Sequence, residues 1–106
     1  MTTLQSSRAA ADRGMAMALG RAESVTPGWS NHAYAFLIDY ARKHGRFISE
    51  DVSRASHADL EFIQPPSPKA WGSVYRRAAM DGVIVMDGVG RSSLRHASIC
   101  PMWRLA

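Results

Sequence analysis

The stretch SPKAWGSVYRRAAMDGVIVMD, residues 67–87, predicts one capped helix that runs into one short strand. Ser67 is a favourable N-cap, and Pro68 suits the first helical position because its missing N–H needs no partner there. Gly82 stands where a left-handed residue commonly ends a helix. We therefore expect a helix over residues 67–81, with the rest of the chain arranged around it.

This helix is predicted to have two chemically different faces. At the helical spacing of i, i+3, i+4 and i+7, one apolar face consists of Trp71, Val74, Tyr75 and Ala78. The opposite face carries Lys69, Ser73 and Arg76, with Arg77 at its shoulder. No Asp or Glu occurs between Ser67 and Met80, so nothing in this stretch balances the cations. A helix of this kind is suited to the major groove of DNA.

A β-hairpin is expected after the helix. Residues 83–87 and 99–105 predict two antiparallel strands, and Asp87-Gly88 is a strong turn signal. Pro101 in the second run indicates an edge strand or a bulge. The predicted tip, residues 88–98, is rich in glycine and serine and carries Arg91, Arg95 and His96.

The remaining periodicity gives the fold class. Apolar residues recur at helical spacing in two segments before residue 45, and a short extended segment and a third helix follow. Leu60, Phe62 and Ile63 look apolar enough to be buried in the connection that follows. The predicted order is a helix over 8–23, a helix over 30–44, a strand over 46–48, a helix over 49–58, the helix over 67–81 and the two strands.

This order predicts an α+β, mostly α, winged helix-turn-helix with an additional N-terminal helix and a small antiparallel β-sheet. Residues 1–28 would form a tail and accessory helix, and residues 29–106 the winged-helix domain. The accessory helix is poor in large apolar groups, so it should dock on the domain or pair with a second copy. A second apolar stripe of Tyr34 and Ile38 could receive it. Trp29 could act as a hydrophobic staple or stay exposed.

Composition agrees with a DNA-binding protein. The chain has 106 residues and a net charge of +4, and its pI is near 9.8. Eleven of the thirteen cationic residues are Arg, which recognises phosphates and base edges better than Lys. The alternatives are an ordinary solvated basic face and a proteome rich in Arg.

Other functions find little support in the sequence. One cysteine, Cys100, allows no internal disulfide, and the four histidines lack metal-ligand spacing. No nucleophile elbow or phosphate-binding glycine loop is present, so we expect no enzyme activity, no cofactor and no metal. No signal peptide or membrane-length apolar run is visible, which favours a cytoplasmic protein.

Several segments resemble a group of small winged-helix proteins of phages and prophages. The segments that carry this resemblance are residues 64–72, 76–78 and 82–84, Gly14-Met15, residues 27–29, 47–52 and 101–104. The resemblance spans nearly the whole chain. It implies DNA binding in phage replication or transcriptional regulation.

These observations predict a protein that binds duplex DNA. Lys69, Ser73 and Arg76 would face the groove, and Arg77, Arg91, Arg95 and His96 would contact phosphates. The alternative is a winged-helix protein–protein interaction module that acts on a phage or host replication or transcription protein. Met80 and Met86, if exposed, would favour it. A third alternative is a homodimer formed through the N-terminal helix.

Overall fold

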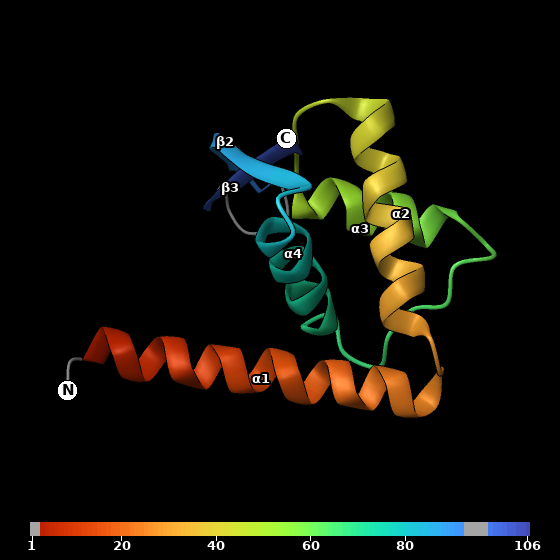
Figure 1. The fold of residues 1–106 in the computed structure, drawn as a ribbon, viewed down its shortest axis with the longest axis vertical. Helices are drawn as coiled ribbons and strands as arrows, with labels where there is room; N and C mark the ends of the chain where they lie inside the picture. Colours follow the sequence, from red (N-terminus) through yellow and green to blue (C-terminus); the bar gives the residue numbers. More distant parts are fainter. Residues whose placement is uncertain (1–2, 93–97) are drawn as a thin grey trace.

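The computed structural model describes residues 3–92 and 98–106, and these residues form a mostly helical α+β structure with a three-stranded antiparallel sheet (Figure 1). The described elements are α1 (Thr3–Val25), α2 (Trp29–His44), β1 (Phe47–Ile48), α3 (Ser49–Ala58), α4 (Ala70–Met80), β2 (Ile84–Arg91) and β3 (Ile99–Leu105). From α2 onward this order is the one expected from the sequence, and it is compatible with a winged helix.

The core lies where α2, α3 and α4 meet the sheet. The expected apolar face of α4 is buried, with Val74 and Ala78 almost inaccessible to solvent. Trp29 is the centre of an aromatic cluster: its ring lies 5.6 Å from that of Trp71 and 6.4 Å from that of Phe62. The sequence-based role of Trp29 as an exposed residue or staple is therefore wrong, because the first residue of α2 points into the core.

The connection between α3 and α4 is only partly buried. Phe62 reaches the aromatic cluster and stacks on Trp71 at 5.5 Å. Leu60 is 98% exposed and Ile63 is 56% exposed, so the expectation that all three apolar residues are buried is wrong. The backbone rather than the side chain of Ile63 is held, because its carbonyl accepts a hydrogen bond from Trp29 Nε1 at 2.8 Å.

The first turn ahead of α4 is tighter than an α-helix. The N–H groups of Ala70 and Trp71 donate to the carbonyls of Ser67 and Pro68 at 3.1 Å, which is the i to i+3 pattern of a 3₁₀ turn. The regular helix therefore begins three residues after Ser67. It ends as predicted: Gly82 adopts φ +72°, and Val83 N donates to Ala78 O at 3.0 Å.

The sheet has the order β1-β3-β2, so β3 is its central strand. β1 pairs with β3 at Phe47↔Trp103 and Ile48↔Met102. Pro101 pairs with Val89 of β2, one residue beyond the part of β3 that pairs with β1. A proline in a central strand is tolerated here because it stands next to a bulge.

That bulge replaces the predicted turn at Asp87-Gly88. The register of β2 shifts between Met86 and Val89, and Gly88 has φ +86°. β2 continues to Arg91, so the turn expected after residue 87 is wrong and the strands of the hairpin are longer than expected. The reason is that a glycine in the left-handed region suits a bulge as well as a turn.

We expect Gly88→Val to lower the free energy of unfolding by about 1–3 kcal/mol, because a β-branched residue is strained at this backbone angle. Urea unfolding followed by circular dichroism measures it. Gly20→Ala is the matched control: Gly20 lies in a helix with open space around it, and alanine there should stabilise the protein by up to about 1 kcal/mol. Equal stability of the Gly88 variant and the parent would contradict the role given to the bulge.

α1 docks on the domain, but mainly against α4 rather than on the Tyr34 and Ile38 stripe of α2. Ala18 and Ala22 are buried in the shared core, and Met15 lies directly over Gly72 of α4. Tyr34 instead faces α4, where its hydroxyl donates to Asp81 at 3.0 Å. The first turns of α1 extend past α4 without contacting the rest of the ribbon (Figure 1).

Candidate nucleic-acid interface

The residues expected to contact DNA lie in two places, on α4 and at the end of β2. Lys69 precedes α4 and is exposed, and none of the ion pairs among the described residues involves it. Arg91 is the last residue of β2, is exposed and pairs across the hairpin with Ile99. Arg95 and His96 lie outside the described residues.

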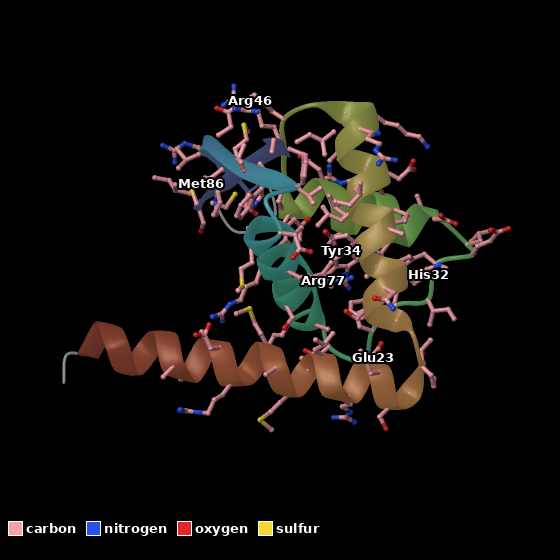
Figure 2. The ribbon with its side chains drawn as sticks, in the orientation of Figure 1. Glu23, His32, Tyr34, Arg46, Arg77 and Met86 are labelled. Atoms are coloured by element: carbon pink, nitrogen blue, oxygen red, sulfur yellow. The ribbon has the colours of Figure 1, made fainter. Side chains whose placement is uncertain are left out.

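The two arginines of α4 are engaged by groups from elsewhere in the chain. Arg76 Nη1 forms an ion pair with Asp12 Oδ1 of α1 at 3.0 Å. Arg77 lies over the ring of Tyr34, 4.1 Å from its centroid, and donates to Asn31 Oδ1 at 2.9 Å. Figure 2 shows Tyr34 and Arg77 turned toward each other between α2 and α4.

The outer face of α4 is therefore not bare. Ser73 Oγ donates to the backbone carbonyl of Met15 at 3.2 Å. A Cβ on Gly72 would collide with the Met15 side chain, so glycine is needed for this approach. The sequence signal of an acid-free basic face missed this arrangement, because Asp12 comes from a distant helix and Asp81 from the turn after α4. Nothing local in the sequence identifies Asp12 as the partner of Arg76.

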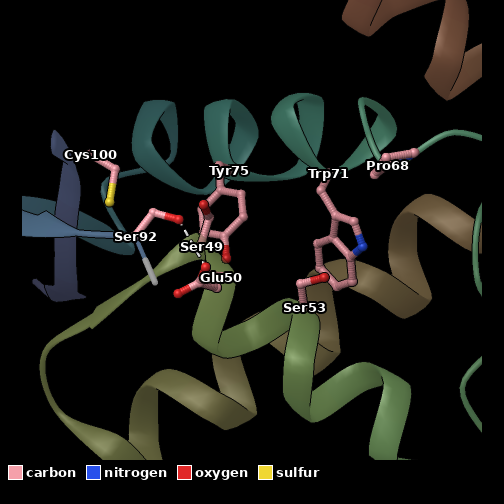
Figure 3. A pocket seen from close by; sticks show the side chains of 8 residues that line it. All are labelled: Ser49, Glu50, Ser53, Pro68, Trp71, Tyr75, Ser92 and Cys100. Carbon is pink, nitrogen blue, oxygen red and sulfur yellow. Dashed lines mark hydrogen bonds between the residues drawn. The ribbon is translucent and has the colours of Figure 1, made fainter. Parts of the chain in front are cut away.

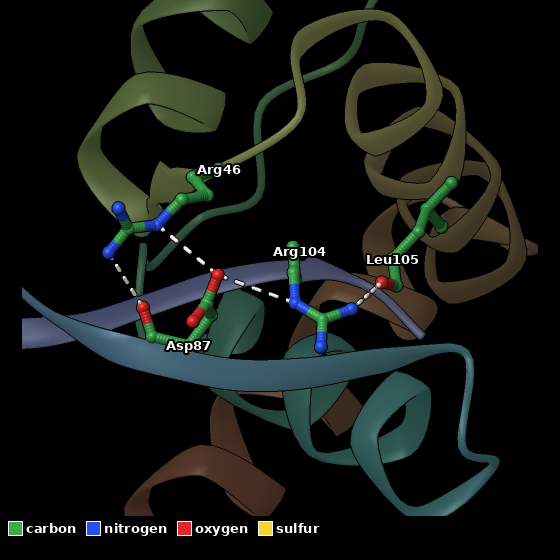
Figure 4. Close-up of polar contacts among 4 residues, drawn as sticks. All are labelled: Arg46, Asp87, Arg104 and Leu105. Carbon is green, nitrogen blue, oxygen red and sulfur yellow. Dashed lines mark hydrogen bonds and ion pairs between the residues drawn. The ribbon is translucent and has the colours of Figure 1, made fainter.

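Figure 4 shows a second basic group, on the sheet, that the sequence did not reveal. Asp87 Oδ2 lies 3.3 Å from the Nε atoms of both Arg46 and Arg104. Arg46 also donates to the Asp87 carbonyl at 3.0 Å. Two guanidinium groups share one carboxylate here, which leaves one surplus positive charge on this part of the sheet. Strand pairing brings the three residues together, so their spacing in the chain carries no signal.

A cavity of about 330 Å³ lies between α3, α4 and the hairpin (Figure 3). Its described lining includes Trp71, Tyr75, Glu50 and Ser92. Ser92 Oγ donates to Glu50 Oε1 at 2.9 Å, which ties the end of β2 to the start of α3. This contact sets the position of the hairpin relative to the two helices.

Tyr75 is the unusual residue of this cavity. Its hydroxyl is buried and has no hydrogen-bond partner among the described residues. Burial, and to a smaller extent the charge of Asp51, raises the pKa of Tyr75 well above its ordinary value. The phenol is therefore neutral at any physiological pH, and its unpaired hydroxyl costs stability.

Two other classes of site were searched for in the described part of the chain. No group of three or more His, Cys, Asp or Glu side chains gathers there in a way that could hold a metal ion. None of the described helices combines the length and the apolar character that crossing a bilayer requires. The arrangement offers cations, hydroxyls and amide groups on α4 and the sheet, which can bind anions by charge and hydrogen bonding.

Comparisons with known proteins add no relative. No protein-family model, no curated protein and no solved structure matches this chain.

Proposed function

We propose that the chain is a winged helix-turn-helix protein that binds duplex DNA, with α4 as the recognition helix and the β2–β3 hairpin as the wing. The observation that carries this proposal is the position of the basic helix: α4 is the last helix before the hairpin, in a unit whose sheet order is β1-β3-β2. The sequence resemblance described above extends the proposal to phage or prophage replication or transcriptional regulation.

The state of the cations on α4 agrees with this role. The Arg76 and Arg77 side chains are 56% and 44% exposed, although both have protein partners. Ion pairs at such positions contribute at most about 1 kcal/mol and are weakened by salt. A phosphate can therefore replace the carboxylates at little cost. Lys69 and Arg91 add charge at the start of α4 and the end of β2.

The direct test is a titration of a fluorescent 20-base-pair duplex at 50 and 200 mM salt. Four phosphate contacts should make the affinity fall on the order of a hundredfold between these salt concentrations. An affinity at low salt no better than about 10⁻⁴ M, the weak end of ordinary non-specific binding, would contradict the proposal.

A matched pair of charge reversals locates the binding surface. Arg76→Glu with Arg77→Glu should weaken duplex binding by about a hundredfold, since two phosphate contacts become repulsive. Arg42→Glu with Lys43→Glu makes the same charge change at the end of α2 and should weaken binding far less. Equal losses would show that binding depends on net charge and not on α4.

The second candidate function is a protein–protein interaction module, and one observation favours it. Met80 is 77% exposed and Met86 is 60% exposed, and adaptable Met side chains suit protein contacts. Figure 2 shows Met86 on β2, on the same side of the molecule as the start of α1. Retained binding of a replication or transcription protein by the α4 charge-reversed variant, together with an unchanged affinity for DNA, would favour this function.

A further inference from the structure

The middle of α1 covers the side of α4 that the proposed function assigns to DNA. Three contacts make this cover: the Asp12–Arg76 ion pair, the hydrogen bond from Ser73 to Met15 O, and the packing of Met15 on Gly72. Figure 1 shows α1 crossing the start of α4. A duplex cannot reach these atoms of α4 while α1 lies there.

The covering part of α1 is held less firmly than the part that follows it. Ala18 and Ala22 are buried in the core, and Glu23 accepts a hydrogen bond from Ser30 N at 2.8 Å, so the end of α1 is anchored. Ahead of Ala18 the side chains of residues 9–13 are all exposed, and the Asp12 and Arg76 groups are 49% and 56% exposed. Water and salt can compete for every polar contact of the cover.

Gly14 weakens the helix inside the cover itself. An added Cβ on Gly14 would meet nothing within 4 Å, so packing does not require a glycine at this position. A glycine in a helix interior costs about 1 kcal/mol relative to alanine. The helix is thus easiest to unwind between its free end and Met15, which is the segment that must leave for α4 to be uncovered.

We propose that residues 3–17 of α1 are an autoinhibitory cover over the recognition face of α4, which duplex DNA displaces while residues 18–25 stay anchored. This inference rests on the proposed function, since the face that it regulates is the proposed DNA-binding face. The Asp12 carboxylate occupies Arg76 as a phosphate would, and binding exchanges one anion for the other. The cover lowers the apparent affinity by the fraction of molecules in which α4 is uncovered.

A reversible disulfide tests the cover. A Cβ built on Gly72 lies 3.9 Å from Met15 Cβ, within the usual range for a disulfide. Met15→Cys with Gly72→Cys, in a Cys100→Ser background, should therefore close a bond that locks α1 onto α4. We expect the oxidised protein to bind the 20-base-pair duplex at least about tenfold more weakly than the same protein after reduction. Titration of free thiols confirms each state.

The outcomes separate the cover from the function. If the reduced protein binds DNA and oxidation leaves the affinity unchanged, the cover is wrong while DNA binding stands. If neither form binds, an opened variant decides: Asp12→Ala with Met15→Ala removes the ion pair and the packing but keeps good helix-forming residues. An opened variant that also fails to bind overturns the proposed function, and the cover with it.

The opened variant also has a matched control. Asp12→Ala removes one negative charge, which by itself favours DNA. Asp39→Ala makes the same change on α2, where Asp39 pairs only with Lys43 at 3.0 Å among the described ion pairs. We expect the opened variant to bind DNA about tenfold more tightly than the Asp39 variant. Equal affinities of the two variants would overturn the cover.

Discussion

Replacing Trp29 with alanine should lower the free energy of unfolding by about 3–5 kcal/mol, because a large buried aromatic side chain is lost and leaves a cavity. Trp29 is 2% exposed and packs edge-on against both Trp71 and Phe62. Its indole N–H also holds the Ile63 carbonyl, so the connection between α3 and α4 loses its tether. Urea unfolding followed by circular dichroism at 222 nm measures the change.

Two further variants make this result specific. Trp29→Phe keeps a ring in the cluster but loses the hydrogen bond, and it should cost less than the alanine variant. Trp103→Ala removes a tryptophan that is only partly buried, on the sheet, and it should also cost less. A loss for Trp29→Ala no larger than that for Trp103→Ala would contradict the central place of Trp29 in the core.

The second large effect should appear at alkaline pH. The pKa of Tyr75 is raised in the folded protein, so the unfolded chain releases its proton first, near pH 10. The stabilisation from keeping this phenol neutral is complete below pH 10 and is lost as the pH rises toward the folded pKa. The free energy of unfolding should therefore fall by about 1.4 kcal/mol for each pH unit above 10 from this residue alone.

Tyr75→Phe is the variant that tests this effect. It should flatten the decline above pH 10, and at pH 7 it should be at least as stable as the parent, since it removes a buried hydroxyl without a partner. The pKa values of Tyr34 and Tyr40 are also raised, chiefly by desolvation, so part of the decline should remain. A Tyr75→Phe variant with the parent's full alkaline decline would contradict the assignment.

Local sequence signals predicted the parts of the fold that depend on neighbouring residues. The buried face of α4, the stop at Gly82 and the bounds of β3 are confirmed, because helical spacing, a left-handed glycine and a strand pattern act over a few residues. The bulge at Asp87-Gly88 could not be predicted in the same way. Its register is set by pairing with β3, and Arg46 and Arg104 hold its carboxylate from two other strands.

The candidate site was predictable in its composition but not in its surroundings. Lys69, Ser73, Arg76 and Arg77 were correctly placed on or beside one helix, away from its buried face. Their partners were not foreseen. The rule that a stretch without acids presents bare cations fails when a distant element supplies the acid, as Asp12 does for Arg76.

The sheet order has a consequence for synthesis of the chain. β1 is only two residues long and pairs with no strand but β3 in the described part of the sheet, so it cannot be paired until residues 99–105 have been made. While the ribosome adds the intervening residues, Phe47 and Ile48 have no strand to lie against. The helices can collapse around Trp29 during that time, because their contacts need no later strand. The sheet should therefore be the last part of the molecule to form.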